Sequence, residues 1–127
     1  MLSRALLLSL ATASLVVSSV ALAGGGLSGK YVTTVKSPAE LKGKWAITFA
    51  KGGTYTVALN GEALARGRYA STANTVTLDR EQGSPCKGAG TYAWKKSGKT
   101  LTFTRKRESA SCQVRAIVLS HRFTQAR

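Results

Sequence analysis

Short runs of alternating apolar and polar residues follow one another along most of the chain. Residues 44–49 read Lys-Trp-Ala-Ile-Thr-Phe, and residues 55–59 repeat this period of two. Such alternation is typical of strands that bury one face. Asn60-Gly61 lies directly after the second run and is a strong signal for a two-residue hairpin turn. These patterns predict β-strands joined by tight turns.

Residues 90–94 and 100–104 form the clearest hairpin, around a Lys-Ser-Gly-Lys turn at 96–99. Continued along the chain, the pattern gives about eight short strands, which fit either a sandwich or an up-and-down barrel. A meander of hairpins favours the barrel, because closure removes exposed strand edges. We therefore expect an all-β chain, an antiparallel up-and-down meander that closes into a small barrel.

Two stretches depart from this alternation. Residues 37–41 (Ser-Pro-Ala-Glu-Leu) predict a short helical turn, with Ser37 as its cap and Glu40 completing a capping box. Residues 112–127 fit both a helical stripe (Val114, Ile117, Val118, His121) and a strand. We expect a helical turn after residue 112 and then a closing strand.

The first 23 residues have the three parts of a secretory signal peptide. A short basic start precedes the apolar residues 5–20, and Ala21-Leu22-Ala23 provides a small-residue cleavage site. A membrane anchor is the alternative, since the run is just long enough to span a bilayer. Cleavage is favoured, and it predicts a secreted or periplasmic protein without a transmembrane segment. Residues 24–36 are then a flexible N-terminal segment, in which 30–36 form a short strand or an extended arm, and 37–127 are the barrel domain.

Cys86 and Cys112 are the two cysteines of the chain. An even number of cysteines in an exported protein favours a disulfide. A metal or redox pair is disfavoured, because there is no C-x-x-C spacing and His121 is the one histidine. We expect no cofactor and no metal.

The chain is strongly basic. Lysine and arginine number 19 against 5 aspartates and glutamates, which gives a formal net charge of +14. Such a charge attracts polyanions, including anionic lipid, acidic polysaccharide and nucleic acid. A solvated basic surface without a partner is the alternative. The predicted basic patch combines cations of the 90–107 hairpin with two arginines expected nearby: Arg66, Arg68, Lys95, Lys96, Lys99, Arg105, Lys106 and Arg107.

Residues 38–45 (P-A-E-L-K-G-K-W) resemble the start of lipocalin-like barrels, where a helical turn leads into a G-x-W motif. In this chain that motif is Gly43-Lys44-Trp45. The resemblance implies that the tryptophan closes one end of the barrel. It also implies that a late arginine, Arg115 or Arg122, stacks over the indole ring as a cation–π contact.

The later part of the chain is similar to small exported bacterial lipocalin-like proteins. Residues 90–94 carry a G-x-Y-x-W hairpin between the two cysteines, and Arg115 lies three residues after the second cysteine. The resemblance covers most of residues 41–123. The chain is shorter than true lipocalins, and their second and third motifs are not readable in it, which bears on whether the barrel keeps an open cavity.

Nothing in the sequence indicates an enzyme. His121 has no acidic neighbour, and the five acidic residues are scattered without a spaced pair. The resemblance implies the binding of a small hydrophobic ligand or a lipid inside the barrel, and we expect a monomer. A solid core is the alternative, since small barrels are normally filled by side chains. The candidate barrel-lining residues are Trp45, Ile47, Phe49, Tyr55, Val57, Tyr69, Val76, Leu78, Tyr92, Trp94, Leu101 and Phe103.

Overall fold

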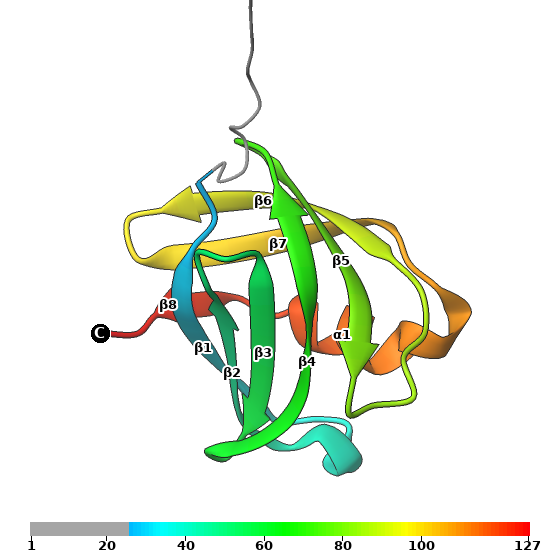
Figure 1. Cartoon of the computed structure of the whole chain (residues 1–127). Coiled ribbons are helices and arrows are strands. Elements are labelled where there is room, and N and C mark those ends of the chain that lie inside the picture. The colour runs from blue at the N-terminus through cyan, green and yellow to red at the C-terminus, as the bar shows by residue number, and fades with distance from the viewer. Residues whose placement is uncertain (1–25) are drawn as a thin grey trace, which may run out of the picture.

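The computed structural model describes residues 26–127, which form a closed antiparallel β-barrel (Figure 1). The predicted signal peptide lies outside the described residues. In chain order the elements are β1 (Gly29–Val35), the 3-10 helix η2 (Ala39–Leu41), β2 (Gly43–Phe49), β3 (Thr54–Leu59), β4 (Glu62–Ser71), β5 (Thr75–Gln82), β6 (Gly90–Ser97), β7 (Thr100–Arg107), the 3-10 helix η3 (Ala110–Cys112), α1 (Gln113–Leu119) and β8 (Phe123–Gln125).

The barrel is a meander in which each strand pairs with its neighbours in sequence. β8 pairs antiparallel with both β7 and β1, and this closes the ring. β8 contributes its three residues, Phe123, Thr124 and Gln125, to these two pairings. The predicted all-β barrel of about eight antiparallel strands is therefore confirmed.

The period of two decides which side chains fill the barrel. In β2, Trp45, Ile47 and Phe49 are buried, and the residues between them are not. Corresponding residues of the other strands join them in one hydrophobic cluster. Aromatic rings pack edge to face inside it, as between Phe49 and Tyr69, whose ring centroids are 5.0 Å apart. Contacts of this kind add to the stabilisation that burial alone provides.

The expected hairpin turn and the glycine of the G-x-W motif both have backbone angles in the positive-φ region. Asn60 and Gly61 both have positive φ, 52° and 86°, as a type I′ hairpin turn requires between β3 and β4. Gly43 has a φ of 140°, and a Cβ there would lie 2.8 Å from Leu59 Cδ1. The glycine of the G-x-W motif is therefore required by close packing at the start of β2.

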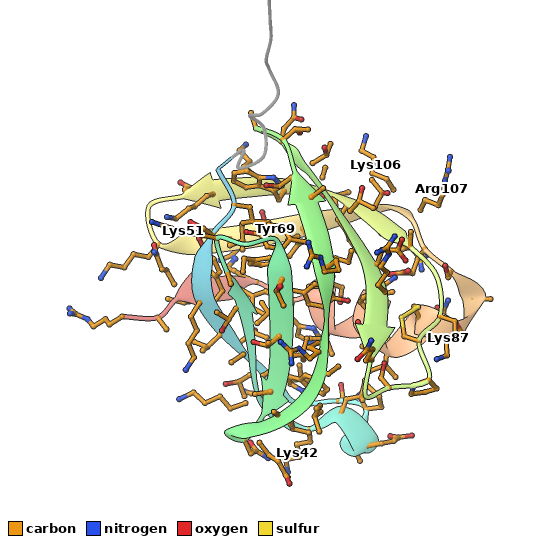
Figure 2. All side chains as sticks on the ribbon, viewed as in Figure 1. Lys42, Lys51, Tyr69, Lys87, Lys106 and Arg107 are labelled. Carbon is orange, nitrogen blue, oxygen red and sulfur yellow. A yellow bond between two sulfur atoms is a disulfide. The ribbon has the colours of Figure 1, made fainter. Side chains whose placement is uncertain are left out.

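The odd-numbered strands all end at one end of the barrel, where η2, η3 and α1 lie; we call it the helical end. The opposite, N-terminal end is filled by side chains. Leu27 is 1% exposed there, and its carbonyl oxygen accepts a hydrogen bond from the Tyr69 hydroxyl at 2.9 Å. Tyr69 lies among the strands in Figure 2.

Three expectations about chain boundaries and helices need correction. Residues 29–35 form β1, which agrees with the short strand expected for this stretch but not with a flexible segment, so the barrel begins before residue 37. The helical turn after Ser37 is present as η2, but no side chain caps it. The expected helix after Cys112 and the closing strand are present as α1 and β8, but Val118 is the one residue of the helical stripe that is buried, together with Arg115 and Leu119. None of the helices in residues 26–127 has the length and apolar character needed to cross a membrane.

Candidate ligand-binding site

A cavity of about 140 Å³ lies at the helical end, between strands β2 to β5 and α1. Most of its wall is apolar and comes from the barrel interior and the buried face of α1. Leu64 of β4 and Val114 of α1 also line it, although they are 40% and 49% exposed. These two side chains mark the side on which the cavity meets solvent. The apolar residues of the inner wall include Trp45, Ile47, Val57, Leu78, Val118 and Phe123.

One corner of the cavity is polar. The Tyr55 hydroxyl donates to Glu81 Oε1 at 2.5 Å, and the Ser84 hydroxyl donates to Glu81 Oε2 at 2.5 Å. Arg115 Nη1 lies 3.5 Å from Glu81 Oε1 and 3.4 Å from the Tyr55 hydroxyl. All four residues line the cavity, and the Glu81 side chain is 8% exposed. The corner is therefore a hydrogen-bonded cluster at the edge of an apolar space.

Arg115 extends this cluster away from the cavity. Its guanidinium group holds Glu108 with two hydrogen bonds, Nε to Oε2 at 2.9 Å and Nη2 to Oε1 at 2.6 Å. Nη2 also donates to the carbonyl oxygen of Gly88, and the Tyr92 hydroxyl donates to Glu108. Such two-point guanidinium–carboxylate pairs are among the stronger hydrogen bonds in proteins.

The cluster shifts the pKa values of its members. Burial alone would raise the pKa of the Glu108 carboxyl, but hydrogen bonds from Arg115 and Tyr92 outweigh it and lower the pKa below 4.5. Burial raises the pKa of the Tyr55 hydroxyl, and the bond to Glu81 raises it further. The pKa of Tyr92 is raised in the same way, by burial and by Glu108. At neutral pH the two tyrosines are therefore neutral donors and Glu108 is an anion.

The disulfide fixes the wall of the cavity that the helices form. Cys86 and Cys112 are bonded, with their Cα atoms 4.5 Å apart, and both side chains line the cavity. The bond ties the loop after β5 to the residue that precedes α1. The predicted pairing is confirmed, and it holds the polar corner against the helix.

All twelve candidate barrel-lining residues lie in the core cluster. Nine of them are buried, and Val57, Tyr69 and Trp94 are partly buried against the rest. They do not share one function, however, because only some of them border the cavity and the others fill the barrel. Those on the cavity are Trp45, Ile47, Tyr55, Val57 and Leu78.

The predicted stacking of an arginine over Trp45 is not found in residues 26–127. The Trp45 indole nitrogen donates to the carbonyl oxygen of Leu41 at 2.7 Å, and Arg122 is exposed. The cation–π contact in the described chain is that of Lys96, 6.0 Å from the centre of the Tyr31 ring. Arg115 does line the cavity together with Trp45, but its guanidinium is occupied by carboxylates.

The eight residues of the predicted basic patch are all exposed. Positive charge is not confined to one face, however. Figure 2 shows Lys106 and Arg107 at one corner, while Lys42, Lys51 and Lys87 project in other directions. Within residues 26–127, every lysine and arginine except Arg115 is exposed, and both ion pairs involve Arg115.

Glu81 and Glu108 are not among the site residues that the sequence predicts. Strict alternation after Val76 and Leu78 would turn residue 80 inward, but Arg80 has a φ of 54° and the pairing with β4 shifts there. This bulge turns Glu81 inward and leaves Arg80 exposed. Nothing in the sequence marks Glu108; the structure shows that Gly90 leaves room for it, because a Cβ there would collide with Glu108 and Arg115.

In the described part of the chain, no three acidic, histidine or cysteine side chains are grouped to hold a metal ion. His121, whose Nδ1 lies 3.0 Å from the carbonyl oxygen of Ile117, is not among the residues that line the cavity. Comparison of the chain with protein-family models, curated proteins and solved structures finds no match.

Proposed function

We propose that this chain is an exported, lipocalin-like, non-enzymatic binding protein that holds a small apolar ligand in the cavity at its helical end. The observation that carries the proposal is the cavity itself, an apolar space of about 140 Å³ bordered by the exposed side chains of Leu64 and Val114. Small barrels are normally packed solid, so an unfilled space of this size is unusual.

The volume favours a ligand of about one aromatic ring over a lipid. Pockets for drug-sized ligands measure about 300–1,000 Å³. An apolar cavity of about 150 Å³ in another protein stays dry and takes up benzene. Exposed apolar residues lie next to the cavity, including Ile117 on the next turn of α1, and they favour the approach of an apolar ligand.

Toluene titration followed by amide NMR shifts and calorimetry tests the proposal. We expect shifts at residues around the cavity and a measurable Kd. Val57→Phe, which fills the cavity from β3, should abolish binding. Val32→Phe is the matched control, because Val32 lies on the outer face of β1 beside Lys30 and Lys44. Binding that survives Val57→Phe, or no binding by the unsubstituted protein, would refute the proposal.

The disulfide agrees with the proposed export to an oxidising compartment. The Cys86–Cys112 disulfide is of the kind that persists in secreted and periplasmic proteins. We propose that the protein acts there as a monomer. Recovery of the oxidised protein from the periplasm or medium of its own host, lacking the first 23 residues, is the expected result.

A second candidate function is the binding of polyanions. It is favoured by the exposed cations of residues 26–127, none of which forms an ion pair with a carboxylate. Affinity for a sulfated polysaccharide should then fall steeply with salt. Changing Lys95, Lys106 and Arg107 to glutamate should weaken binding more than changing Lys42, Lys51 and Lys87, if the predicted patch is the site. Equal losses would show that overall charge alone is responsible, and no binding at low salt would exclude this function.

A further inference from the structure

We propose that the cavity selects ligands that carry a hydrogen-bond donor, such as an alcohol or an amine, next to their apolar part, and that Glu81 is the acceptor. This inference rests on the proposed function and names the chemical class of the ligand. The observation behind it is the polar corner, where Tyr55, Glu81, Ser84 and Arg115 meet on an otherwise apolar wall.

The hydrogen bonds within the corner use up the hydrogens of its two hydroxyl groups. An ionised carboxylate only accepts, so the Tyr55 and Ser84 hydroxyls must both point their hydrogens at Glu81. The Tyr55 oxygen also accepts from Arg115 Nη1 at 3.4 Å, and the Ser84 oxygen accepts from the backbone N–H of Cys86 at 3.3 Å, so neither hydroxyl has a hydrogen to offer. Glu81 Oε2 has Ser84 as its one donor among the described residues, although each carboxylate oxygen can accept two. A ligand in the cavity therefore meets acceptors.

The charge of the corner also favours a ligand with a hydrogen-bond donor. Arg115 is the one cation of the cluster, and its shortest contacts are with Glu108, at 2.6 and 2.9 Å. Its distance to Glu81 is 3.5 Å. Two carboxylates thus share one guanidinium, and Glu81, which borders the cavity, is the less neutralised of the two. A donor or a cation is favoured there, and an anion is repelled.

Four probes that share one ring test the inference: toluene, benzyl alcohol, benzylamine and benzoate. We expect benzyl alcohol and benzylamine to bind about 10-fold or more tightly than toluene, as hydrogen bonds to a charged acceptor imply. Benzoate should bind more weakly than toluene. The titrations are run at about 0.15 M salt, so that the basic surface does not attract benzoate from a distance.

Glu81→Gln removes the charge with little change of shape and should reduce the advantage of benzylamine over toluene about 10-fold. Glu62→Gln is the control, because Glu62 is an exposed glutamate of β4 outside the cavity. Should Glu81→Gln fail to fold, the order of the four probes on the unsubstituted protein still decides. Equal binding of toluene and the two donors, or preference for benzoate, overturns the inference and leaves the proposed function standing. Failure of all four probes to bind overturns both.

Discussion

Arg115 connects more parts of the molecule than any other side chain of the polar cluster. From α1 it reaches Glu108 after β7, the Gly88 carbonyl oxygen before β6, Tyr55 on β3 and Glu81 on β5. Its side chain is 6% exposed, so these contacts are shielded from water. A charge in such a place is stabilised by its partners, and they in turn depend on it.

Arg115→Met should lower the free energy of unfolding by about 3–5 kcal/mol, because it leaves buried carboxylates without their cation. Urea unfolding followed by tryptophan fluorescence measures this loss. Arg122→Met, at an exposed arginine, should change the stability by less than about 0.5 kcal/mol. A loss below about 1 kcal/mol in Arg115→Met would show that water reaches the carboxylates.

Glu108 should make the barrel sensitive to acid. Its pKa in the folded protein is lower than the ordinary 4.5, so its contribution to stability is fully present above that pH. The contribution is lost as the pH falls through the lower folded value. Unfolding free energies measured between about pH 5 and pH 2 should therefore fall less steeply in Glu108→Gln than in the unsubstituted protein. The exposed Glu62→Gln should keep the original slope, and an unchanged slope in Glu108→Gln would contradict the assignment.

At the scale of the elements, alternation predicted the strands well because one face of each is buried. Trp45, Ile47 and Phe49 lie where the period of two puts them. The same rule could not find Glu81, because the bulge at Arg80 depends on pairing with β4, and pairing is a long-range property. Leu27 is not predicted either, because a single apolar residue among glycines and serines has no period.

The helix α1 illustrates the limit of pattern reading for short elements. Val114 and Ile117 fit a helical stripe, but they are 49% and 37% exposed, and Arg115 is buried instead. The face that α1 turns inward is decided by Cys112, whose disulfide precedes the helix, and by the ion pairs of Arg115. Neither constraint is a hydrophobic period, so the buried face of α1 keeps Val118 of the stripe but is rotated away from Val114 and Ile117.

Replacing Cys86 and Cys112 by serine together should lower the free energy of unfolding by about 2–4 kcal/mol. The bond closes a loop with a sequence separation of 26, for which the chain-entropy relation gives about 3.5 kcal/mol. The double variant should also lose affinity for toluene, since both cysteines border the cavity. Chemical reduction of the unsubstituted protein serves as the control and should give the same stability. A loss below about 1 kcal/mol would mean that the helical end holds without the bond.

At the scale of the whole molecule, the two ends of the barrel differ. The N-terminal end is filled by Leu27, Tyr31 and Tyr69, whereas the helical end keeps a cavity beneath α1. The tyrosines lie on four different strands, and burial raises the pKa of each above 10.0. Their ionisation therefore reports whether the whole barrel is folded.

Alkaline titration should therefore unfold the protein and ionise its tyrosines in one step. Because the folded pKa values are raised, the tyrosines add to stability below pH 10.0, and this contribution is lost as the pH rises further. Ultraviolet absorbance of tyrosinate should appear together with the loss of the folded circular dichroism signal. In denaturing urea the same residues should ionise near pH 10. Tyrosinate formation in the folded barrel would show that its interior is open to hydroxide.

The three residues of β8 also cover the edges of two longer strands. β1 and β7 are 7 and 8 residues long, and Phe123–Gln125 is the strand that lies between them. If this strand were displaced, each of its neighbours would present a row of free N–H and C=O groups, on which a strand from a second molecule could add. The fully buried ring of Phe123 and the backbone bonds from Gln125 to Lys99 and from Ala126 to Lys30 resist that displacement. Residues 123–126 thus shield both strand edges from pairing with another chain.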